Sequence, residues 1–555
     1  MNPSLPSTQC AVQLIGPDQL TLNCRKPVPR PGPHEILCRV DVVGLCFSDM
    51  KLLQQFSRHV RKAPVISGAP EGVLDSLAAY VPGDRPTVPG HEPVVTIVAV
   101  GNKVQRFQPG ERHFIQADWR WLKTAGSNGA FGYNFEGALQ EYVVLDERLV
   151  ISPEGECMLL PAPIGTRSAS AFGLVEPWAC VECSYRTPER QTLLGGARRL
   201  IWTDVTPGPE LAAFLGAQPA AKSTDWTGAA AASPAVAGAR RVEPDTLEPE
   251  AYDDVLYLGA ISASVERIFP ACRNGALILI AQCGQVFGAP VQTALGALHY
   301  RGLRMAGTAG QDPAQAAVTI PECGDIRRGD RIHVIGAGGP MGVMHVIRNL
   351  CEGVPDIELT AADLSDERLA ALAHLAEPAA KQAGVKYQGY NSSAGSRPGP
   401  WSYTVVMAPV PALVASAVRD SGPGAIINIF AGIPVDKGGP VDLDAYCRNG
   451  MYFIGTSGSR MDDMRAVLRK VEDGRLNTNV SVAAVAGLDG AIDGMRAVKN
   501  QEVPGKILIY PACRGMPLTR LEDLSRIAPE VSALLSDGVW TLEAENALRA
   551  RYAEG

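Results

Sequence analysis

The sequence lacks an excess of positive charge and a long apolar run, and no signal peptide is visible in it. Its net charge is −7 over 555 residues, whereas nucleic-acid-binding proteins usually carry a basic patch. No stretch approaches the run of about 18 apolar residues that predicts a transmembrane helix. The first ten residues have neither the basic nor the apolar region of a signal peptide. We therefore expect a small-molecule substrate, no nucleic-acid or membrane partner, and a cytoplasmic location.

Paired cysteines are also scarce. The 13 cysteines are an odd number and are scattered along the chain, which favours reduced thiols over a disulfide framework. The single CxxC motif, Cys180–Cys183, has no second pair. We expect its thiols to be buried on a helix rather than to bind a metal.

The length and the residue pattern indicate several domains. Single hydrophobic cores stop growing near about 250–300 residues, so a chain of 555 is expected to divide. Residues 8–150 are rich in short β-branched runs separated by Gly/Pro turns, among them Glu35–Val43, Val94–Val100 and Leu139–Leu145. From about residue 186, apolar strands alternate with helical stretches, which predicts a parallel α/β sheet.

The α/β region repeats itself. Gly275 precedes an apolar strand just as Gly424 does, 149 residues later, and Gly302 and Gly450 are 148 residues apart. The strands Asp253–Tyr257 and Tyr403–Met407 precede the first of these glycines in each copy. We interpret the region as two α/β units in tandem.

The two copies differ in their strand-to-helix turns. Leu200–Asp204 resembles Leu359–Asp363, so we match the opening strand of the first copy to the second strand of the second copy. On this interpretation the first copy lacks the phosphate-binding strand. Residues 218–238 are rich in Ala and Pro and are interpreted as a surface loop. We expect a degenerate copy that binds no nucleotide.

The second copy carries a nucleotide-binding pattern. Glycines after a buried strand bring backbone N–H groups against a pyrophosphate at a helix N-terminus. Ala337 stands where the strict pattern has glycine, and Asp363 follows at the end of the next apolar strand, where an acidic side chain binds the adenosine ribose. Arg368 can accommodate a 2′-phosphate, so we expect NAD, with NADP possible. The predicted cofactor-binding residues are Gly336, Gly338, Gly339, Pro340, Met341, Gly342, Asp363 and Arg368.

Three further residues suggest a catalytic metal site. Cys46, His91 and Glu176 offer a thiolate, an imidazole and a carboxylate. Such a set fills three corners of a zinc tetrahedron and leaves the fourth for water or substrate. Together with a nucleotide-binding turn, these residues indicate redox chemistry.

These stretches resemble the zinc-dependent medium-chain dehydrogenases. The resemblance covers about residues 1–185 and 325–511. Glu176-Pro177 and the Gly-Gly-Pro-Met-Gly turn are similar to the sorbitol dehydrogenase and sorbose phosphate reductase branch. The other matching segments are Gly44–Asp49, Gly90–Glu92, Asn134–Leu145 and Gly505–Ile509.

The resemblance implies a GroES-like β-barrel domain and a Rossmann domain, with a degenerate Rossmann-like unit inserted between them. The expected boundaries are 1–185 for the catalytic domain, completed by about 500–515, then 186–324 for the degenerate unit, 325–499 for the NAD-binding domain and 516–555 for a helical extension. Because nucleotide domains of this family commonly pair across a dimer, we expect either a homo-oligomer or a monomer with an internal pseudo-dimer.

The resemblance also implies roles for single residues. Cys46, His91 and Glu176 would bind zinc, with Glu92 as an alternate ligand or a carboxylate beside the ligands. Asp49 would fix the tautomer of the ligand histidine, and Ser48 would relay the substrate proton. Many members have four clustered cysteines for a structural zinc, but residues 112–137 contain none. We expect one catalytic zinc and no structural zinc.

The function implied is hydride transfer between NAD(H) and a polyol, sugar or sugar-phosphate alcohol. Dehydrogenation of another secondary alcohol or a threonine-like amino alcohol is an alternative, as is a non-catalytic NAD-binding or assembly protein. The basic run Arg58–Lys62 either meets a substrate phosphate or is a solvated charge run, and we favour the second. Residues 519–551 are interpreted as amphipathic helices that cap a surface.

Overall fold

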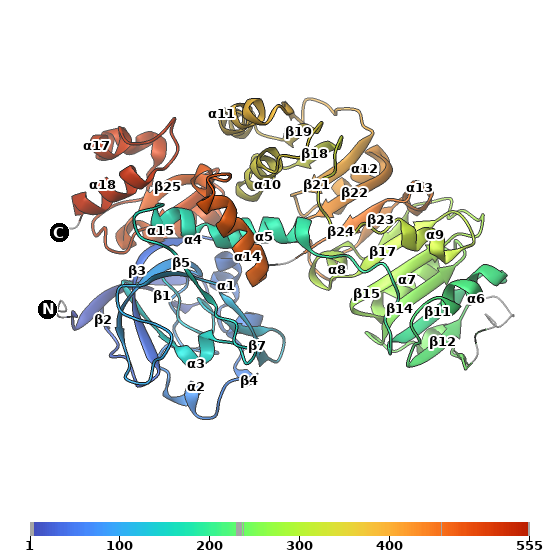
Figure 1. Ribbon diagram of the computed structural model, residues 1–555, viewed down its shortest axis with the longest axis horizontal. Helices are drawn as coiled ribbons and strands as arrows, with labels where there is room; N and C mark the ends of the chain where they lie inside the picture. Colours follow the sequence, from blue (N-terminus) through green and yellow to red (C-terminus); the bar gives the residue numbers. More distant parts are fainter. Residues whose placement is uncertain (1–4, 229–235, 237, 457, 553–555) are drawn as a thin grey trace. The chain divides into compact units, whose positions relative to one another are not determined.

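The computed structural model describes residues 5–228, 236, 238–456 and 458–552. The chain forms two compact units (Figure 1). Unit 1 comprises Met1–Ala179 and Met464–Gly555, and unit 2 comprises Cys180–Asp463. Within the described residues, none of the helices has the length and apolar character needed to span a membrane.

Unit 1 is built on an eight-stranded sheet with the order β10-β6-β5-β3-β26-β25-β27, and β9 also pairs with β3. Pairing is antiparallel except between β25 and β26. The strands predicted at 35–43, 94–100 and 139–145 correspond to β3, β5 and β9. The strands are β3 (Glu35–Gly44), β5 (Glu92–Val100), β6 (Arg112–Ile115), β9 (Tyr142–Asp146), β10 (Leu159–Pro161), β25 (Val482–Ala486), β26 (Lys506–Ile509) and β27 (Thr519–Arg520).

Two smaller sheets complete the β-structure of unit 1. They are the hairpin of β1 (Thr8–Gly16) and β2 (Gln19–Pro27), and the sheet of β4 (Val65–Ser67), β7 (Asp118–Thr124) and β8 (Asn128–Ala130). A disulfide joins Cys10 and Cys24 across the hairpin. The expectation of reduced thiols is wrong for this pair. In the antiparallel hairpin Gln9 lies opposite Lys26 and Ala11 lies opposite Asn23, and this register brings the two cysteines together.

The helices of unit 1 include those that end the chain. The carboxylate of Glu545, which is buried, accepts the backbone N–H groups of Ala169 at 2.6 Å and Ser170 at 3.0 Å. Tyr510 donates to the same carboxylate at 2.9 Å. The predicted extension at 516–555 is therefore an integral part of unit 1. The helices are α1 (Phe47–Gln55), α2 (Val73–Ser76), α3 (Glu147–Val150), α4 (Ala169–Gly173), α15 (Ala491–Lys499), α16 (Leu524–Ile527), α17 (Pro529–Ser532) and α18 (Leu542–Tyr552), while α5 (Val175–Arg186) and α14 (Met461–Glu472) cross the unit boundary.

The return of the chain to unit 1 comes earlier than predicted. Residues 464–499, assigned from the sequence to the NAD-binding domain, lie in unit 1. The reason is strand pairing: β25 pairs with β26, which in turn pairs with β3 of the catalytic sheet.

Unit 2 contains two parallel sheets of six strands with corresponding orders, β13-β12-β11-β14-β15-β17 and β20-β19-β18-β21-β22-β24. Numbered within each copy, both are 3-2-1-4-5-6, the order of a Rossmann sheet. The first copy contains β11 (Arg198–Thr203), β12 (Ser223–Thr227), β13 (Arg240–Arg241), β14 (Tyr252–Leu258), β15 (Cys272–Ala281), β17 (Arg304–Thr308), α6 (Pro209–Gly216), α7 (Ser262–Ala271), α8 (Leu295–Tyr300) and α9 (Pro313–Val318). The second contains β18 (Arg331–Ile335), β19 (Glu358–Asp363), β20 (Lys386–Asn391), β21 (Trp401–Val406), β22 (Ser421–Ile429), β24 (Tyr452–Ile454), α10 (Pro340–Cys351), α11 (Asp366–Ala383), α12 (Pro411–Asp420) and α13 (Leu443–Arg448).

The strand order corrects the interpretation of the first copy. β11 lies between β12 and β14, as β18 lies between β19 and β21. It is therefore the counterpart of the first strand, and the copy does not lack its phosphate-binding strand. What it lacks is the glycine turn, since Asp204 follows β11 and accepts hydrogen bonds from Trp202 and Tyr257. The predicted loop at 218–238 includes β12, and its residues 229–235 and 237 lie outside the described part.

The two copies share one hydrophobic core within unit 2, to which Leu298 and Met305 of the first copy and Ile427 and Phe453 of the second contribute. Their edge strands β17 and β24 lie side by side, and β16 (Val291–Thr293) pairs antiparallel with β23 (Gly439–Val441). The exposed edge that each sheet would otherwise present is thus covered by the other copy.

Candidate metal and nucleotide sites

Strand register brings the predicted metal ligands of unit 1 together. Gly44 at the end of β3 lies opposite Glu92 at the start of β5, so Cys46 and His91 occupy adjacent ends of paired strands. Cys46 is also the N-cap residue of α1, and its backbone N–H donates to Asp49 Oδ2 at 3.2 Å. The loop between β3 and α1 is thereby held in a defined conformation.

Cys46, His91 and Glu92 form a potential metal site. One ligand atom from each residue lies within 4.8 Å of the others, and this is the one such group of three among the residues that the structure describes. His91 and Glu92 are buried and Cys46 is half-buried. A thiolate, an imidazole and a carboxylate at this separation fit a zinc ion.

Asp49 orients the imidazole. His91 Nδ1 and Asp49 Oδ1 are 2.9 Å apart in the interior of unit 1, which leaves Nε2 to face Cys46. Burial lowers the pKa of His91, but the charge and hydrogen bond of Asp49 outweigh it and raise the pKa well above its ordinary value. This carboxylate–histidine pair is the arrangement that fixes the tautomer of a metal-ligating histidine.

Lys506 on β26 holds the third ligand candidate. Its Nζ donates to Glu92 Oε1 at 2.7 Å, and the buried Oε2 lies 2.6 Å from Nζ without an aligned hydrogen bond. Burial lowers the pKa of Lys506, but the charges of Glu92 and Cys46 raise it above its ordinary value. A Cβ on Gly44 would lie 2.4 Å from Glu92 Oε2, so glycine is required there for the carboxylate to keep its place.

Glu176 is not in the group of three. It is the second residue of α5 and is half-buried, and its charge contributes to the raised pKa of Lys506. The carboxylate therefore lies within electrostatic range of the site. The assignment of Glu176 as a zinc ligand stays a prediction, and Glu92 is the carboxylate that the geometry places beside Cys46 and His91.

Ser48 connects the ligands to Tyr133. Its Oγ donates to Cys46 Sγ at 3.1 Å and lies 3.2 Å from His91 Nε2. A hydrogen bond with Ser48 also affects the pKa of Tyr133, which burial raises above its ordinary value. The serine hydroxyl thus lies beside both ligand side chains, and its role as a proton relay stays a prediction.

The glycine turn of unit 2 follows β18. Gly336 has φ +83°, a conformation that favours glycine. A Cβ on Gly342 would lie 2.4 Å from Gly336 O, and one on Gly338 would lie 2.6 Å from Arg368 Cβ. Gly339 is the N-cap of α10, with Pro340 and Met341 in the first turn. The backbone N–H groups of this turn can bind a pyrophosphate.

Asp363 ends β19 beside the turn. Its Oδ2 accepts Gly338 N–H at 2.9 Å, and its Oδ1 accepts the N–H groups of Leu364 at 2.9 Å and Ser365 at 3.1 Å. The carboxylate is 7% exposed. It therefore stabilises the turn itself, while Arg368, in the first turn of α11, is half-buried next to it.

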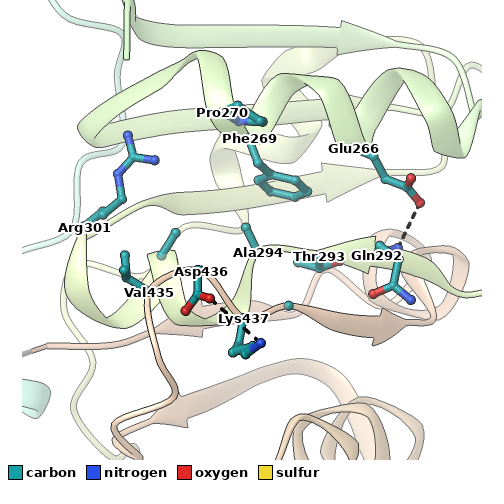
Figure 2. A pocket seen from close by; sticks show the side chains of 12 residues that line it. Glu266, Phe269, Pro270, Gln292, Thr293, Ala294, Arg301, Val435, Asp436 and Lys437 are labelled. Carbon is teal, nitrogen blue, oxygen red and sulfur yellow. Dashed lines mark hydrogen bonds and ion pairs between the residues drawn. The ribbon is translucent and has the colours of Figure 1, made fainter. Parts of the chain in front are cut away.

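A separate cavity of about 360 Å³ lies in unit 2 between α7, β16 and residues 435–438 (Figure 2). Gln292 N–H donates to Glu266 Oε1 at 3.2 Å, and Lys437 pairs with Asp436 at 3.8 Å. None of the predicted site residues lines this cavity. The cavity lies where the two α/β copies meet, and it is separate from the metal and nucleotide sites.

Sequence reasoning missed Lys506 and Tyr133 as site residues. A lysine that begins the apolar strand Lys506–Ile509 is a signal for a buried ion pair, but its partner is 414 residues away. Tyr133 directly precedes the matching segment Asn134–Leu145 and contacts His91, with ring centroids 5.5 Å apart. The sequence around Lys506 and Tyr133 does not indicate which residue each of them contacts.

Parts of the chain are similar to known proteins. Residues 32–154 match the alcohol dehydrogenase GroES-like domain. The mannitol-1-phosphate 5-dehydrogenase of Aliivibrio fischeri is 28% identical over 252 residues, which cover 41% of this chain and 58% of that protein. The L-sorbose 1-phosphate reductase of Klebsiella pneumoniae is 28% identical over 228 residues, covering 39% and 54%. The chain thus spans less than two thirds of these relatives.

A solved structure supports the fold. The 2R,3R-butanediol dehydrogenase of Bacillus subtilis matches with a TM-score of 0.51 at 15% identity, over 91% of this chain and 99% of that one. The fold and site define a class of proteins that join a GroES-like domain to a Rossmann domain. Residues 32–154 are similar to the alcohol dehydrogenase GroES-like domain, and the predicted fold class is confirmed.

Proposed function

We propose that the protein transfers a hydride between a nicotinamide cofactor and a secondary alcohol of a polyol, sugar or sugar phosphate. The observation that carries the proposal is the buried group of Cys46, His91 and Glu92, in a chain that also has a Rossmann glycine turn. A scaffold protein needs neither the buried group of ligand side chains nor the glycine turn. Buried charged groups cost stability unless they are paired, so a protein without a catalytic site gains nothing from them.

The residues of this chain have distinct roles in the proposed reaction. A zinc ion held by Cys46, His91 and a carboxylate would supply the Lewis acid that lowers the pKa of the substrate hydroxyl. Ser48 would relay the hydroxyl proton, accepting it as its own proton passes on, and a bound nicotinamide would accept the hydride from the carbon that carries the hydroxyl. Asp49 orients His91 at 2.9 Å, and Lys506 holds Glu92 at 2.7 Å.

The relatives support the substrate class. Both are named for phosphorylated polyols or ketoses. The resemblance that points to polyols rests on Glu176 as a ligand, whereas Glu92 is the carboxylate found beside Cys46 and His91. Another secondary alcohol or an amino alcohol is the alternative that a substrate panel separates.

We further propose NAD rather than NADP. Asp363 ends the second strand of the nucleotide-binding copy, where a carboxylate accepts ribose hydroxyls and repels a 2′-phosphate. Arg368 lies beside it and is the residue through which NADP would bind. One zinc per chain and a cytoplasmic location belong to the same proposal.

The test is a panel of polyols and sugar phosphates with NAD and NADP, comparing the native protein with Cys46→Ser. We expect NADH formation from at least one member and loss of turnover by more than about 100-fold in the variant. Phe47→Ala, which changes an exposed neighbour (55% exposed), is the matched control. No turnover of any member, or equal turnover by Cys46→Ser, would refute the proposal.

A further inference from the structure

Tyr133 forms a wall of the site beside the metal ligands. Its ring is 2% exposed and lies 5.5 Å from the ring of His91, centroid to centroid. His59 packs on the same tyrosine ring at 5.2 Å. The segment that carries His59, which lies between Cys46 and His91 in the sequence, therefore reaches the site.

Arg61 lies on this wall. It belongs to the short helix η2 (Val60–Lys62), and its guanidinium carbon is 5.4 Å from the centroid of the Tyr133 ring. The Tyr133 centroid lies 5.4 Å from this carbon and 5.5 Å from the His91 ring centroid, so the carbon is at most 10.9 Å from the His91 ring centroid. The side chain is 30% exposed and forms a long ion pair with Asp118, at 4.0 Å.

The basic run is anchored rather than freely solvated. Lys62 is buried, and its Nζ donates to Val81 O and to Arg85 O, the latter at 2.9 Å. The N–H of Arg61 donates to His59 Nδ1 at 3.2 Å. These contacts fix the backbone on both sides of Arg61. The favoured interpretation of residues 58–62 as a solvated charge run is thus wrong for residues 59 and 62, which are buried.

The positive charge of the wall belongs to Arg61. Burial, followed by the charges of Arg61 and Lys51, lowers the pKa of His59 to about 4, so this imidazole is neutral at pH 7. A guanidinium has five N–H donors in a planar fork that matches oxyanions. It can bind one in addition to its contact with Asp118. The guanidinium also makes a cation–π contact with the Tyr133 ring.

We propose that Arg61 is a specificity-determining residue that binds an oxyanion of the substrate, and that this oxyanion is a phosphate monoester on the polyol. The proposal rests on the function proposed above and names the substrate class within it. A polyol chain bound by its hydroxyl at Cys46 and His91 would extend along Tyr133 and present its phosphate to Arg61. A carboxylate at the same place is the other source of an oxyanion.

The experiment compares a polyol, its phosphate monoester and its sugar acid as substrates. The native protein is expected to show its highest kcat/KM with the phosphate ester. Arg61→Gln should raise KM for that ester about 10- to 100-fold, with a much smaller change in kcat. Inorganic phosphate should inhibit the native protein competitively, and this inhibition should weaken by a similar factor in Arg61→Gln. Arg61→Lys should keep part of the effect.

Arg58→Gln is the matched control, because Arg58 is an exposed residue of the same basic run. This variant should leave kcat, KM and the inhibition by phosphate unchanged. Turnover of the plain polyol at equal or higher kcat/KM would overturn the inference and leave the proposed function standing. An equal loss for all three substrates in Arg61→Gln would also overturn it. A preference for the acid would overturn the phosphate assignment, and no turnover of any substrate would refute the proposed function itself.

Discussion

Removal of Lys506 tests how the buried carboxylate of the metal site is held. Glu92 is 1% exposed, and Lys506 Nζ lies 2.7 Å from its Oε1 and 2.6 Å from its Oε2. Lys506→Met leaves that carboxylate buried without its cation, which costs about 3–5 kcal/mol. We therefore expect the free energy of unfolding of unit 1 to fall by that amount in metal-free protein.

Zinc should reduce this loss. A cation bound by Cys46 and His91 would lie beside Glu92 and partly replace the charge of the lysine, so the variant should lose less stability with zinc than with a chelator. The assay is urea unfolding followed by tryptophan fluorescence under both conditions. Lys499→Met removes an exposed ion pair with Asp18, of 2.8 Å, and should cost less than about 1 kcal/mol. Equal losses in Lys506→Met and Lys499→Met would refute the reasoning.

Three other predictions concern the metal site, the acid stability and the sheet edges. Gly44→Ala should displace Glu92, because the new Cβ would lie 2.4 Å from Glu92 Oε2. We expect metal titration to show a zinc affinity lowered by about 10-fold or more. Gly173→Ala is the control, because its new Cβ would lie 3.5 Å from the nearest atom. Burial lowers the pKa of His333 to about 4, and burial followed by the charge of Arg348 lowers that of His345 to about 3. Below about pH 6.5 these histidines therefore bind protons in the unfolded chain but not in the folded chain. The free energy of unfolding of unit 2 should fall by about 1.4 kcal/mol per pH unit for each histidine as the pH drops toward 4. A urea midpoint that is unchanged between pH 7 and pH 5 would contradict this. Because β17 covers the edge of β24 within one chain, we propose that the two α/β copies form an internal pseudo-dimer. Light scattering should then give the mass of a single chain. Twice that mass would indicate self-association through another surface.

Much of the fold is readable from the sequence. The β-branched runs of the catalytic sheet and the glycine turn at 336–342 appear as elements because their local chemistry is unambiguous. The tandem copies are visible because equivalent glycines recur at nearly constant spacing. In each case the signal is short-range.

The errors come from long-range pairing. Leu200–Asp204 ends in an acidic residue, as β19 does, and only its position between β12 and β14 identifies it as the first strand. The disulfide between Cys10 and Cys24 depends on the register of a hairpin. The Lys506–Glu92 pair joins strands from opposite ends of the chain. No local pattern encodes these contacts.

The candidate site shows the same division. Cys46 and His91 are predicted together and lie together, because Cys46 follows β3 and His91 precedes β5, and these two strands pair. The carboxylate is harder to choose, since Glu92 and Glu176 both lie within electrostatic range of Lys506. Geometry favours Glu92, and the resemblance implies Glu176.

Metal content measured on the gently purified protein tests the central claim most directly. We expect about one zinc per chain, with occupancy reduced well below half in Cys46→Ser and unchanged in Phe47→Ala. Zinc below about half an equivalent in the native protein, or the same zinc content in Cys46→Ser as in the native protein, would contradict the assignment of Cys46 and His91 as ligands of a catalytic metal.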